Sequence, residues 1–182
     1  MTQPPTFQLK DFCKLFGFQD RQVRFVLEQG FVPQGVAQHP STGNRREFRP
    51  LHAFWLAIVL HLKNSGMKTP AAAMVANMAS EGVRIVTQNF NWDGKFLPLE
   101  GSFETEHQYF LDIGDLKYIR LVTDANPSHD GLYEFPWRPV KGQGKVHAYE
   151  PFVILRLDLT HIARVLASVK GWTAGPPRRR KL

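Results

Sequence analysis

Arginine and phenylalanine side chains share one face of a short predicted helix near the N-terminus. In the stretch QDRQVRFVLEQG, a helical turn of about 100° per residue puts three apolar residues on one side: Val23, Val26 and Leu27. The opposite side carries Arg21, Arg24, Phe25 and Glu28, with Gln22 at its edge. Arginine can form bidentate contacts with guanine or phosphate, so this second face has the chemistry of a nucleic-acid contact.

A second group of arginines follows in a stretch rich in turn-forming residues, QGVAQHPSTGNRREFRP. Arg45, Arg46 and Arg49 surround Phe48 there, which predicts a hairpin with a basic tip or flank. Beside a duplex, such arginines would neutralise phosphates and fix register without reading sequence. The alternative for both groups is a solvated basic surface, and the alternative for Phe25 is packing against the first helix or the hairpin.

The charge of the chain favours an acidic partner. Its formal net charge is +7 and its isoelectric point is about 9.8. Residues 1–82 carry nine basic and five acidic side chains, whereas residues 83–182 carry fourteen and eleven. Four of those fourteen form the terminal run at 178–181, so the basic folded surface is expected in the first segment.

Several functional classes are disfavoured by what the sequence lacks. Cys13 is the single cysteine, which excludes an internal disulfide and a thiolate-rich metal site. No stretch approaches the ~18 apolar residues that span a membrane. The second half shows no close-spaced metal-ligand motif, phosphate loop or nucleophile elbow. Its candidate acid–base groups are therefore scattered: His107, Asp112, Asp115, Asp124, His129, Asp130, Asp158 and His161. We expect a soluble cytoplasmic protein with no metal, no cofactor and no enzymatic activity.

Four helices are predicted in the first segment from the spacing of apolar residues and from capping signals. They cover Gln8–Phe16, Arg21 to about Gln29, Leu51–Lys63, and Thr69 to about Ser80 with Gly82 beyond it. The cap of the second helix is expected at Gln19 or Asp20. Because a turn of three or four residues separates the first two helices, they form a helix-turn-helix candidate.

The apolar period changes after Val83. Tyr109, Leu111 and Ile113 alternate with polar neighbours, and LKYIRLVTD and PFVILRLD are further β-rich runs. We predict a small, mainly antiparallel sheet within 83–158, then a helix from Leu159 to about Lys170. The predicted fold class is α+β. The predicted domains are residues 1–82, residues 83–171 as a dimerisation, effector or interaction domain, and a basic flexible tail at 172–182.

The first segment resembles the DNA-binding domain of the MerR family of bacterial transcription regulators over residues 7–79. The resemblance is carried by FQLKDFCKLFGF, then DRQVRFVLEQGFVP, then GNRREFRPLHAFWLAIVLHLKNSGMKTPAAAMVANM. It implies a winged helix-turn-helix in which the second helix enters the major groove and the wing follows the flanking backbone. It also implies a dimer on a palindromic site.

Individual positions carry the resemblance further. Arg21 and Arg24 match arginines of the family's recognition helix, and Arg46 and Phe48 match the arginine and the aromatic residue of its wing. Phe25 stands where the family usually has tyrosine. The cysteines of the metal-sensing members are missing. Gly82 and the β-rich region are expected to interrupt the long helix through which many members dimerise.

The sequence therefore predicts a sequence-specific regulator of transcription that binds double-stranded DNA as a homodimer in the bacterial nucleoid. Its predicted DNA contacts are Arg21, Gln22, Arg24, Phe25, Arg45, Arg46 and Arg49. Whether a small-molecule or protein effector acts through residues 83–171 is left open by the sequence. The alternatives are a mobile-element DNA-binding factor, such as an excisionase or a packaging recognition subunit, and a protein-binding adaptor built on the same fold.

Overall fold

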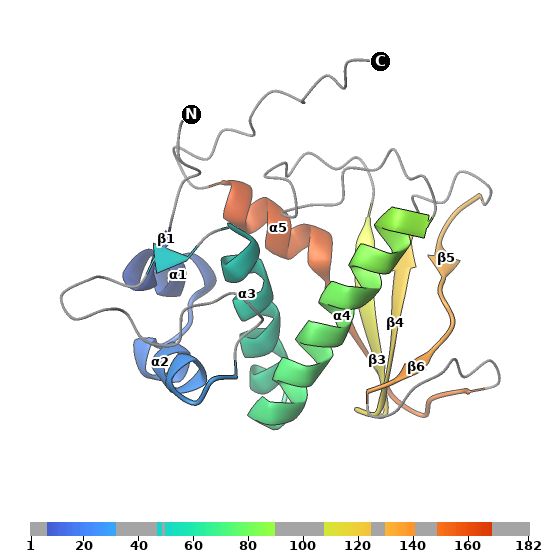
Figure 1. The fold of residues 1–182 in the computed structure, drawn as a ribbon, viewed down its shortest axis with the longest axis horizontal. Coiled ribbons are helices and arrows are strands. Elements are labelled where there is room, and N and C mark those ends of the chain that lie inside the picture. The colour runs from blue at the N-terminus through green and yellow to red at the C-terminus, as the bar shows by residue number, and fades with distance from the viewer. Residues whose placement is uncertain are drawn as a thin grey trace, which may run out of the picture.

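A computed structural model of the 182-residue chain describes residues 7–31, 47–48, 50–89, 108–124, 130–140 and 149–168. Helices dominate the first segment (Figure 1): α1 (Leu9–Phe16), α2 (Asp20–Glu28), α3 (Pro50–Asn64) and α4 (Thr69–Asn89). A short ladder joins β1 (Phe7–Gln8) to β2 (Glu47–Phe48). The second segment is a sheet followed by α5 (Leu159–Ala167).

The first two helices pack through aromatic and aliphatic side chains. Gly17, at φ 69°, ends α1 in the left-handed conformation that glycine adopts without steric cost. The turn that follows lets Phe18 pack against Phe12 and Phe16, with ring centroids 5.9 and 5.7 Å apart. Phe48 of β2 closes the same cluster, since its ring lies 5.9 Å from that of Phe12. These contacts hold the turn after α1 and strand β2 against α1.

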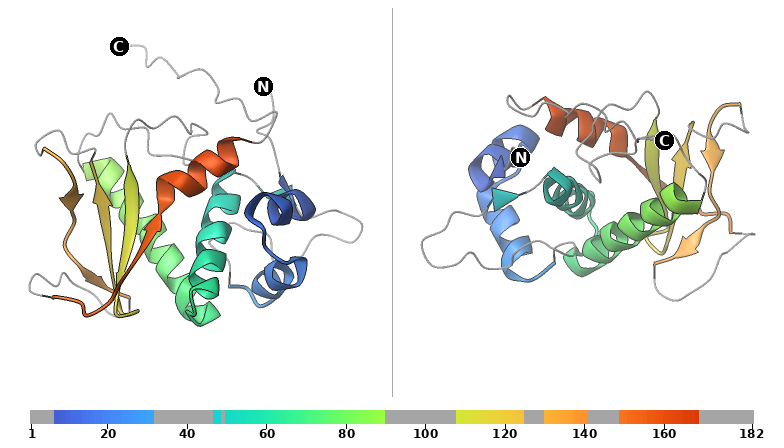
Figure 2. Two further views of the ribbon diagram at one scale, coloured as in Figure 1. Left: turned by 180° about the vertical axis from the view of Figure 1, so that it is seen from behind. Right: turned by 45° about the horizontal axis from the view of Figure 1, so that its top comes forward.

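Helix α3 is the centre of the molecule. Every residue from 53 to 60 is buried, and so is Leu62. A helix that is apolar on all sides must be covered on all sides, and here the other helices and β2 surround it (Figure 2). The buried side chains of the helical segment and of the sheet consequently form one continuous hydrophobic core.

Helix α4 is longer than its sequence signals predict. It begins at Thr69, as expected, but it continues through Gly82 to Asn89 instead of ending near Ser80. The prediction that Gly82 interrupts this helix is wrong. A glycine inside a helix costs only about 1 kcal/mol relative to alanine, which good helix formers earlier in α4, such as Ala76, Met78 and Ala79, can offset. The helix therefore crosses the domain boundary predicted at residue 82.

Three strands form the centre of an antiparallel sheet: β3 (Tyr109–Gly114), β4 (Tyr118–Thr123) and β7 (Ile154–Asp158). Two short strands, β5 (Tyr133–Glu134) and β6 (Arg138–Pro139), pair with β4, and the strand order is β5-β4-β3-β7. The prediction of strands at these alternating runs is confirmed. The range predicted for the sheet began too early, because residues 83–89 belong to α4. Residues 90–107 lie outside the described part of the chain.

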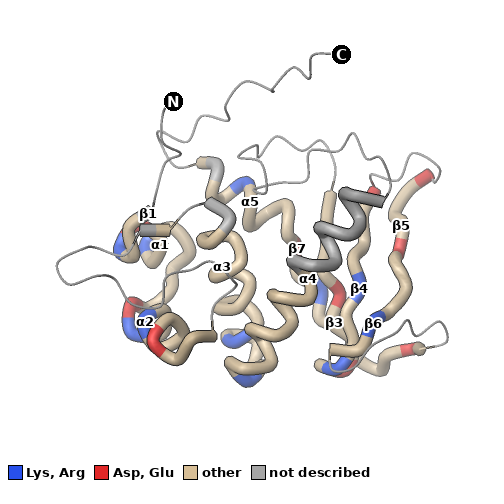
Figure 3. The backbone as a smooth tube through the Cα atoms, in the orientation of Figure 1, with Lys and Arg blue, Asp and Glu red and all other residues tan. Residues whose placement is uncertain are grey.

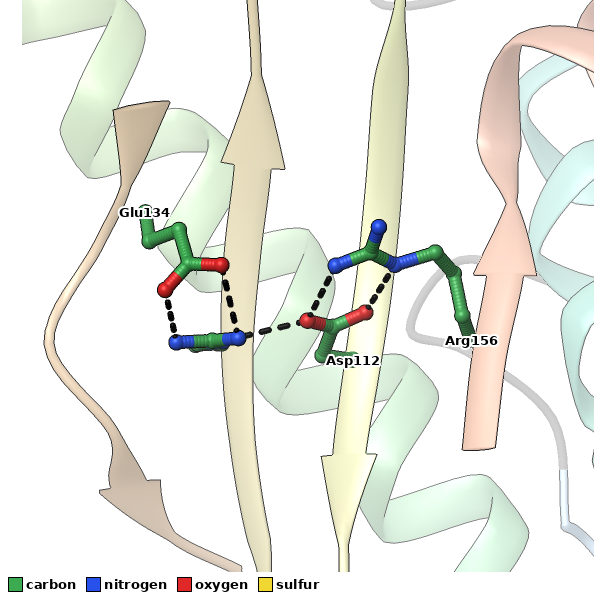
Figure 4. A network of polar contacts seen from close by, with 4 residues as sticks. Asp112, Glu134 and Arg156 are labelled. Atoms are coloured by element: carbon green, nitrogen blue, oxygen red, sulfur yellow. Dashed lines mark hydrogen bonds and ion pairs between the residues drawn. The ribbon is translucent and has the colours of Figure 1, made fainter. Parts of the chain in front are cut away.

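The two faces of the sheet differ in chemistry. Tyr109, Leu111 and Ile113 are buried toward α4 and α5, which cover one face (Figure 2). On the other face the carboxylate of Asp112, fully buried, accepts hydrogen bonds from Arg120 at 3.1 Å and from Arg156 at 2.6 and 2.8 Å. Arg120 also pairs with Glu134 (Figure 4). This charge network holds β3, β4, β5 and β7 in register.

Helix α5 begins directly after β7. The Asp158 side chain accepts a hydrogen bond from the backbone N–H of His161 at 2.7 Å, a standard N-cap. The helix ends at Ala167, three residues before the end predicted at Lys170. It packs on α3 and on β3 and so joins the helical segment to the sheet. The chain is a mixed α+β protein with an N-terminal helix-turn-helix, as its sequence predicts.

Candidate nucleic-acid interface

The two faces of α2 are those that its sequence predicts. Val23, Val26 and Leu27 are fully buried, and they anchor the helix on the core. On the opposite side Arg21, Arg24, Phe25 and Glu28 are exposed and Gln22 is half-buried. Figure 3 shows that basic and acidic positions lie side by side on this helix. A rigid helix therefore displays a mixed surface of two arginines, two carboxylates and a phenylalanine.

Arg24 has a partner on its own helix. Its Nε donates to the Asp20 carboxylate at 2.5 Å, and both side chains are about half exposed. This hydrogen bond raises the pKa of Arg24 above its ordinary value. Asp20 does not cap the helix, because it is the first helical residue, and Gln19 at the N-cap position makes no side-chain cap. The guanidinium of Arg24 is thus held along α2 by a neighbouring carboxylate.

Arg21 and Gln22 are not held in this way. Within the described ranges of the chain, neither side chain takes part in a hydrogen bond or an ion pair. Arg21 projects from the first turn of α2 with its full donor set facing solvent. These two residues are therefore the ones most available to an incoming ligand.

Phe25 is unusually exposed for an aromatic side chain, at 45%. The ammonium of Lys63, in the last turn of α3, lies 5.7 Å from the centre of its ring. A cation over an aromatic ring is attracted to it, so Lys63 adds a positive charge beside the exposed face of α2. Sequence reasoning missed Lys63, because 38 positions separate it from Phe25 and only the packing of α2 on α3 brings them together.

The arginines of the predicted hairpin, Arg45, Arg46 and Arg49, lie outside the described residues. Their flank is described at β2, where Phe48 pairs with Phe7 and is buried in the core. Phe48 therefore anchors the base of this segment on α1. The segment follows Phe31, which comes after α2, and precedes Glu47 of β2. Both of its ends are therefore attached to the helix-turn-helix.

The carboxylates considered as catalytic groups have structural roles. Asp112 balances two arginines, Asp158 caps α5, and Asp124 accepts the backbone N–H of Gln108 at 2.8 Å. The hydroxyl of Tyr149 donates to Asp115 and is the main cause that holds the pKa of Asp115 below its ordinary value. His107 and His129 lie outside the described residues. Among the residues that are described, no three histidine, cysteine or acidic side chains gather as metal ligands would.

None of the described helices is long and apolar enough to cross a lipid bilayer.

The comparison with protein families identifies the helical segment. Residues 7–79 match the family described as MerR HTH family regulatory protein, a span that includes α1, α2, β2, α3 and the first half of α4. No curated protein matches the chain. The matched span contains the whole exposed face of α2 and also Lys63. Residues 7–79 are a MerR-type helix-turn-helix domain, the DNA-binding module of a family of transcription regulators.

Proposed function

We propose that the protein is a sequence-specific regulator of transcription that inserts α2 into the major groove of double-stranded DNA. The single observation that carries this proposal is the exposed face of α2 with Arg21, Arg24 and Phe25, on a helix anchored by three buried residues inside the matched segment. An α-helix fits the major groove, which is about 12 Å wide. A rigid scaffold is what base recognition requires, because a bidentate contact is lost when the helix tilts.

Different roles follow for the residues of this face. Arg21 and Gln22, whose side chains form no hydrogen bond or ion pair within the described chain, are proposed to read base edges. Arg24 lies closer to the helix surface because of Asp20, so we assign it to a phosphate. Phe25 and Lys63 would contact the sugar–phosphate backbone beside the groove, where an ammonium neutralises charge and a ring covers the sugar.

Arg45, Arg46 and Arg49 are proposed as phosphate contacts of the wing. Their support is their charge and their place within the matched family span. Together with Lys63 they would neutralise about four phosphates, and Arg24 would add part of a fifth because Asp20 competes for it. The logarithm of affinity would fall by ~0.9 per contact for each tenfold rise in salt. Steep salt dependence is therefore part of the proposal. We further propose that the protein binds DNA as a homodimer in the bacterial nucleoid and that an effector acts through the second segment.

The test is footprinting of the purified full-length protein on genomic fragments of its source, near physiological salt and with competitor DNA. We expect a small number of protected palindromic sites, since two copies of α2 would read two half-sites. Arg46→Ala should weaken specific and random DNA alike and flatten the salt dependence by ~0.9.

Two other outcomes would replace this proposal with a different function. Salt-sensitive binding at tandem sites, with bending of the DNA, would indicate a mobile-element architectural factor. No salt-sensitive binding to any duplex would indicate a protein-binding adaptor.

A further inference from the structure

Strand β7 lies at an edge of the sheet. In the strand order β5-β4-β3-β7, it has a neighbouring strand on one side only within the described part of the chain. Leu155 and Leu157 pack against the hydrophobic core but are only partly buried, and Ile154 is 46% exposed. The core therefore does not enclose β7. The edge of a sheet presents unpaired N–H and C=O groups, which pair readily with another chain.

The register of β3 with β7 shows which backbone groups face this edge. The N–H of Asp115 donates to the carbonyl of Val153 at 2.9 Å, so these two residues continue the ladder as a hydrogen-bonded pair. Bonded and non-bonded pairs alternate along an antiparallel ladder, so Ile154 and Arg156 point their N–H and C=O groups away from β3. Among the described residues, no backbone hydrogen bond reaches these groups. Groups at this spacing are matched by the backbone of another extended strand.

Charged residues alternate in sign across the sheet, on the face that α4 and α5 do not cover (Figure 4). Arg120 of β4 donates to Glu134 of β5 at 2.9 Å and to Asp112 of β3 at 3.1 Å. Arg156 of β7 donates to the same Asp112 at 2.6 and 2.8 Å. The register sets Asp112 directly opposite both arginines. The series from β5 to β7 is therefore negative, positive, negative, positive, and it ends on Arg156 at the open edge.

The guanidinium of Arg156 can accommodate a further acceptor. Its side chain is 40% exposed, whereas that of Arg120 is 13% exposed. Nε and Nη2 of Arg156 bond Asp112, and Nη1 has no hydrogen-bond partner among the residues that the structure describes. Opposite charges on neighbouring strands attract each other, and like charges destabilise the pairing. An acidic side chain on an added strand would continue the alternation.

We propose that the open edge of β7 binds an extended acidic segment of another protein, which adds a strand to the sheet. The backbone of this segment pairs with the free groups of Ile154 and Arg156, as in other cases of strand addition. A glutamate of the segment faces Arg156, and apolar residues on either side of it lie beside Leu155 and Leu157. A second copy of β7 fits less well, because antiparallel pairing along its full length would set two Arg156 side chains opposite each other. The proposed partner is distinct from DNA, and its test uses DNA-free protein, so either proposal can fail alone.

Amide hydrogen exchange of the full-length protein, followed by NMR, tests strand addition. The probe is the acetylated heptapeptide Thr-Lys-Val-Glu-Val-Ile-Thr, whose glutamate faces Arg156 when it lies antiparallel to β7. In the free protein the amides of Ile154 and Arg156 should exchange fast, while those of Leu155 and Leu157 are protected by β3. The peptide at about 1 mM should slow the first two amides at least about tenfold. The proposal is overturned if the peptide leaves them unchanged, or if they are already protected in the free protein. Protection that appears only at high protein concentration would assign the edge to a second copy and would also overturn it.

Matched peptides and variants test the two parts of the recognition, by fluorescence anisotropy of the labelled peptide. A peptide with lysine in place of glutamate should bind the wild type about fivefold more weakly, and Arg156→Gln should bind the two peptides alike. Ile154→Pro removes an N–H that points away from β3, and proline is tolerated at such edge positions, so the fold and its melting temperature should be kept while peptide affinity falls at least about tenfold. Ile154→Val keeps the N–H and should bind as the wild type does. Equal binding of the two peptides to the wild type, or full affinity in Ile154→Pro, would refute the proposal.

Discussion

Replacing Asp20 with asparagine should strengthen DNA binding, because Asp20 competes with phosphate for Arg24. The carboxylate of Asp20 holds the Arg24 guanidinium along α2, in an ion pair that solvent reaches from both sides. Exposed pairs at this spacing are weak and easily exchanged. Asparagine nearly preserves the size of the side chain and favours helix N-termini, so the helix itself should be little affected.

The expected gain can be worked from the number of contacts. If Arg24 is freed for one full phosphate contact, the salt slope steepens by up to ~0.9, which corresponds to about eightfold tighter binding at 0.1 M salt relative to 1 M. The gain should fall toward zero as salt approaches 1 M. Fluorescence anisotropy of a labelled operator or random duplex, titrated at several salt concentrations, measures both the affinity and the slope.

Two variants make this measurement specific to the pair. Asp11→Asn removes the same charge from an exposed position on α1 and should give a smaller gain. In an Arg24→Gln background, Asp20→Asn should lose most of its effect, because no guanidinium remains to be released. An equal gain with and without Arg24 would refute the competition between Asp20 and phosphate, and so would no gain at all in the single variant.

Three further predictions concern the scaffold. Asp112→Ala should lower the free energy of unfolding by about 2–3 kcal/mol. This is less than the roughly 3–5 kcal/mol of a fully buried ion pair, because Arg120 keeps Glu134 as a partner and Arg156 is partly exposed. Thermal melting should show a smaller loss for Glu134→Ala. Gly114→Ala should lose about 1–3 kcal/mol in urea denaturation, because the added carbon would lie 3.0 Å from Pro151 and from Tyr149; wild-type stability would contradict this. Burial against Phe16 and Phe18 lowers the pKa of His61 below its ordinary value, so the unfolded chain binds the proton first. Stability should therefore fall as pH drops from about 6.5 through the lower pKa of the folded protein. His61→Phe should flatten that profile, and an unchanged profile would assign the pH dependence to other groups.

Periodicity predicted the elements whose burial is one-sided. The apolar face of α2 could be read from the spacing of Val23, Val26 and Leu27, and the strands β3, β4 and β7 from alternation, because one face of each meets the core. The end of α4 could not be read in this way. Gly82 is a weak breaker, and whether a helix continues through it depends on packing that a single sequence does not display.

Sequence spacing can predict a local ion pair, but it cannot predict contacts between residues that lie far apart in the chain. The i, i+4 spacing of Asp20 and Arg24 is visible in the sequence and would have predicted their ion pair. Lys63 over Phe25 needed the packing of α3 against α2. Arg156 reaches Asp112 across 44 positions only because the register of β3 with β7 sets them opposite each other.

The most direct test of the central claim is the affinity of Arg21→Ala for a footprinted site, for versions of that site with single base pairs changed, and for random duplex. If α2 reads the major groove, the variant should lose about 5- to 150-fold on the intact site and should no longer discriminate at one base pair in each half-site, while its binding to random DNA changes little. Unchanged affinity and unchanged discrimination in Arg21→Ala, in a protein that still binds its site, would contradict the placement of α2 in the groove.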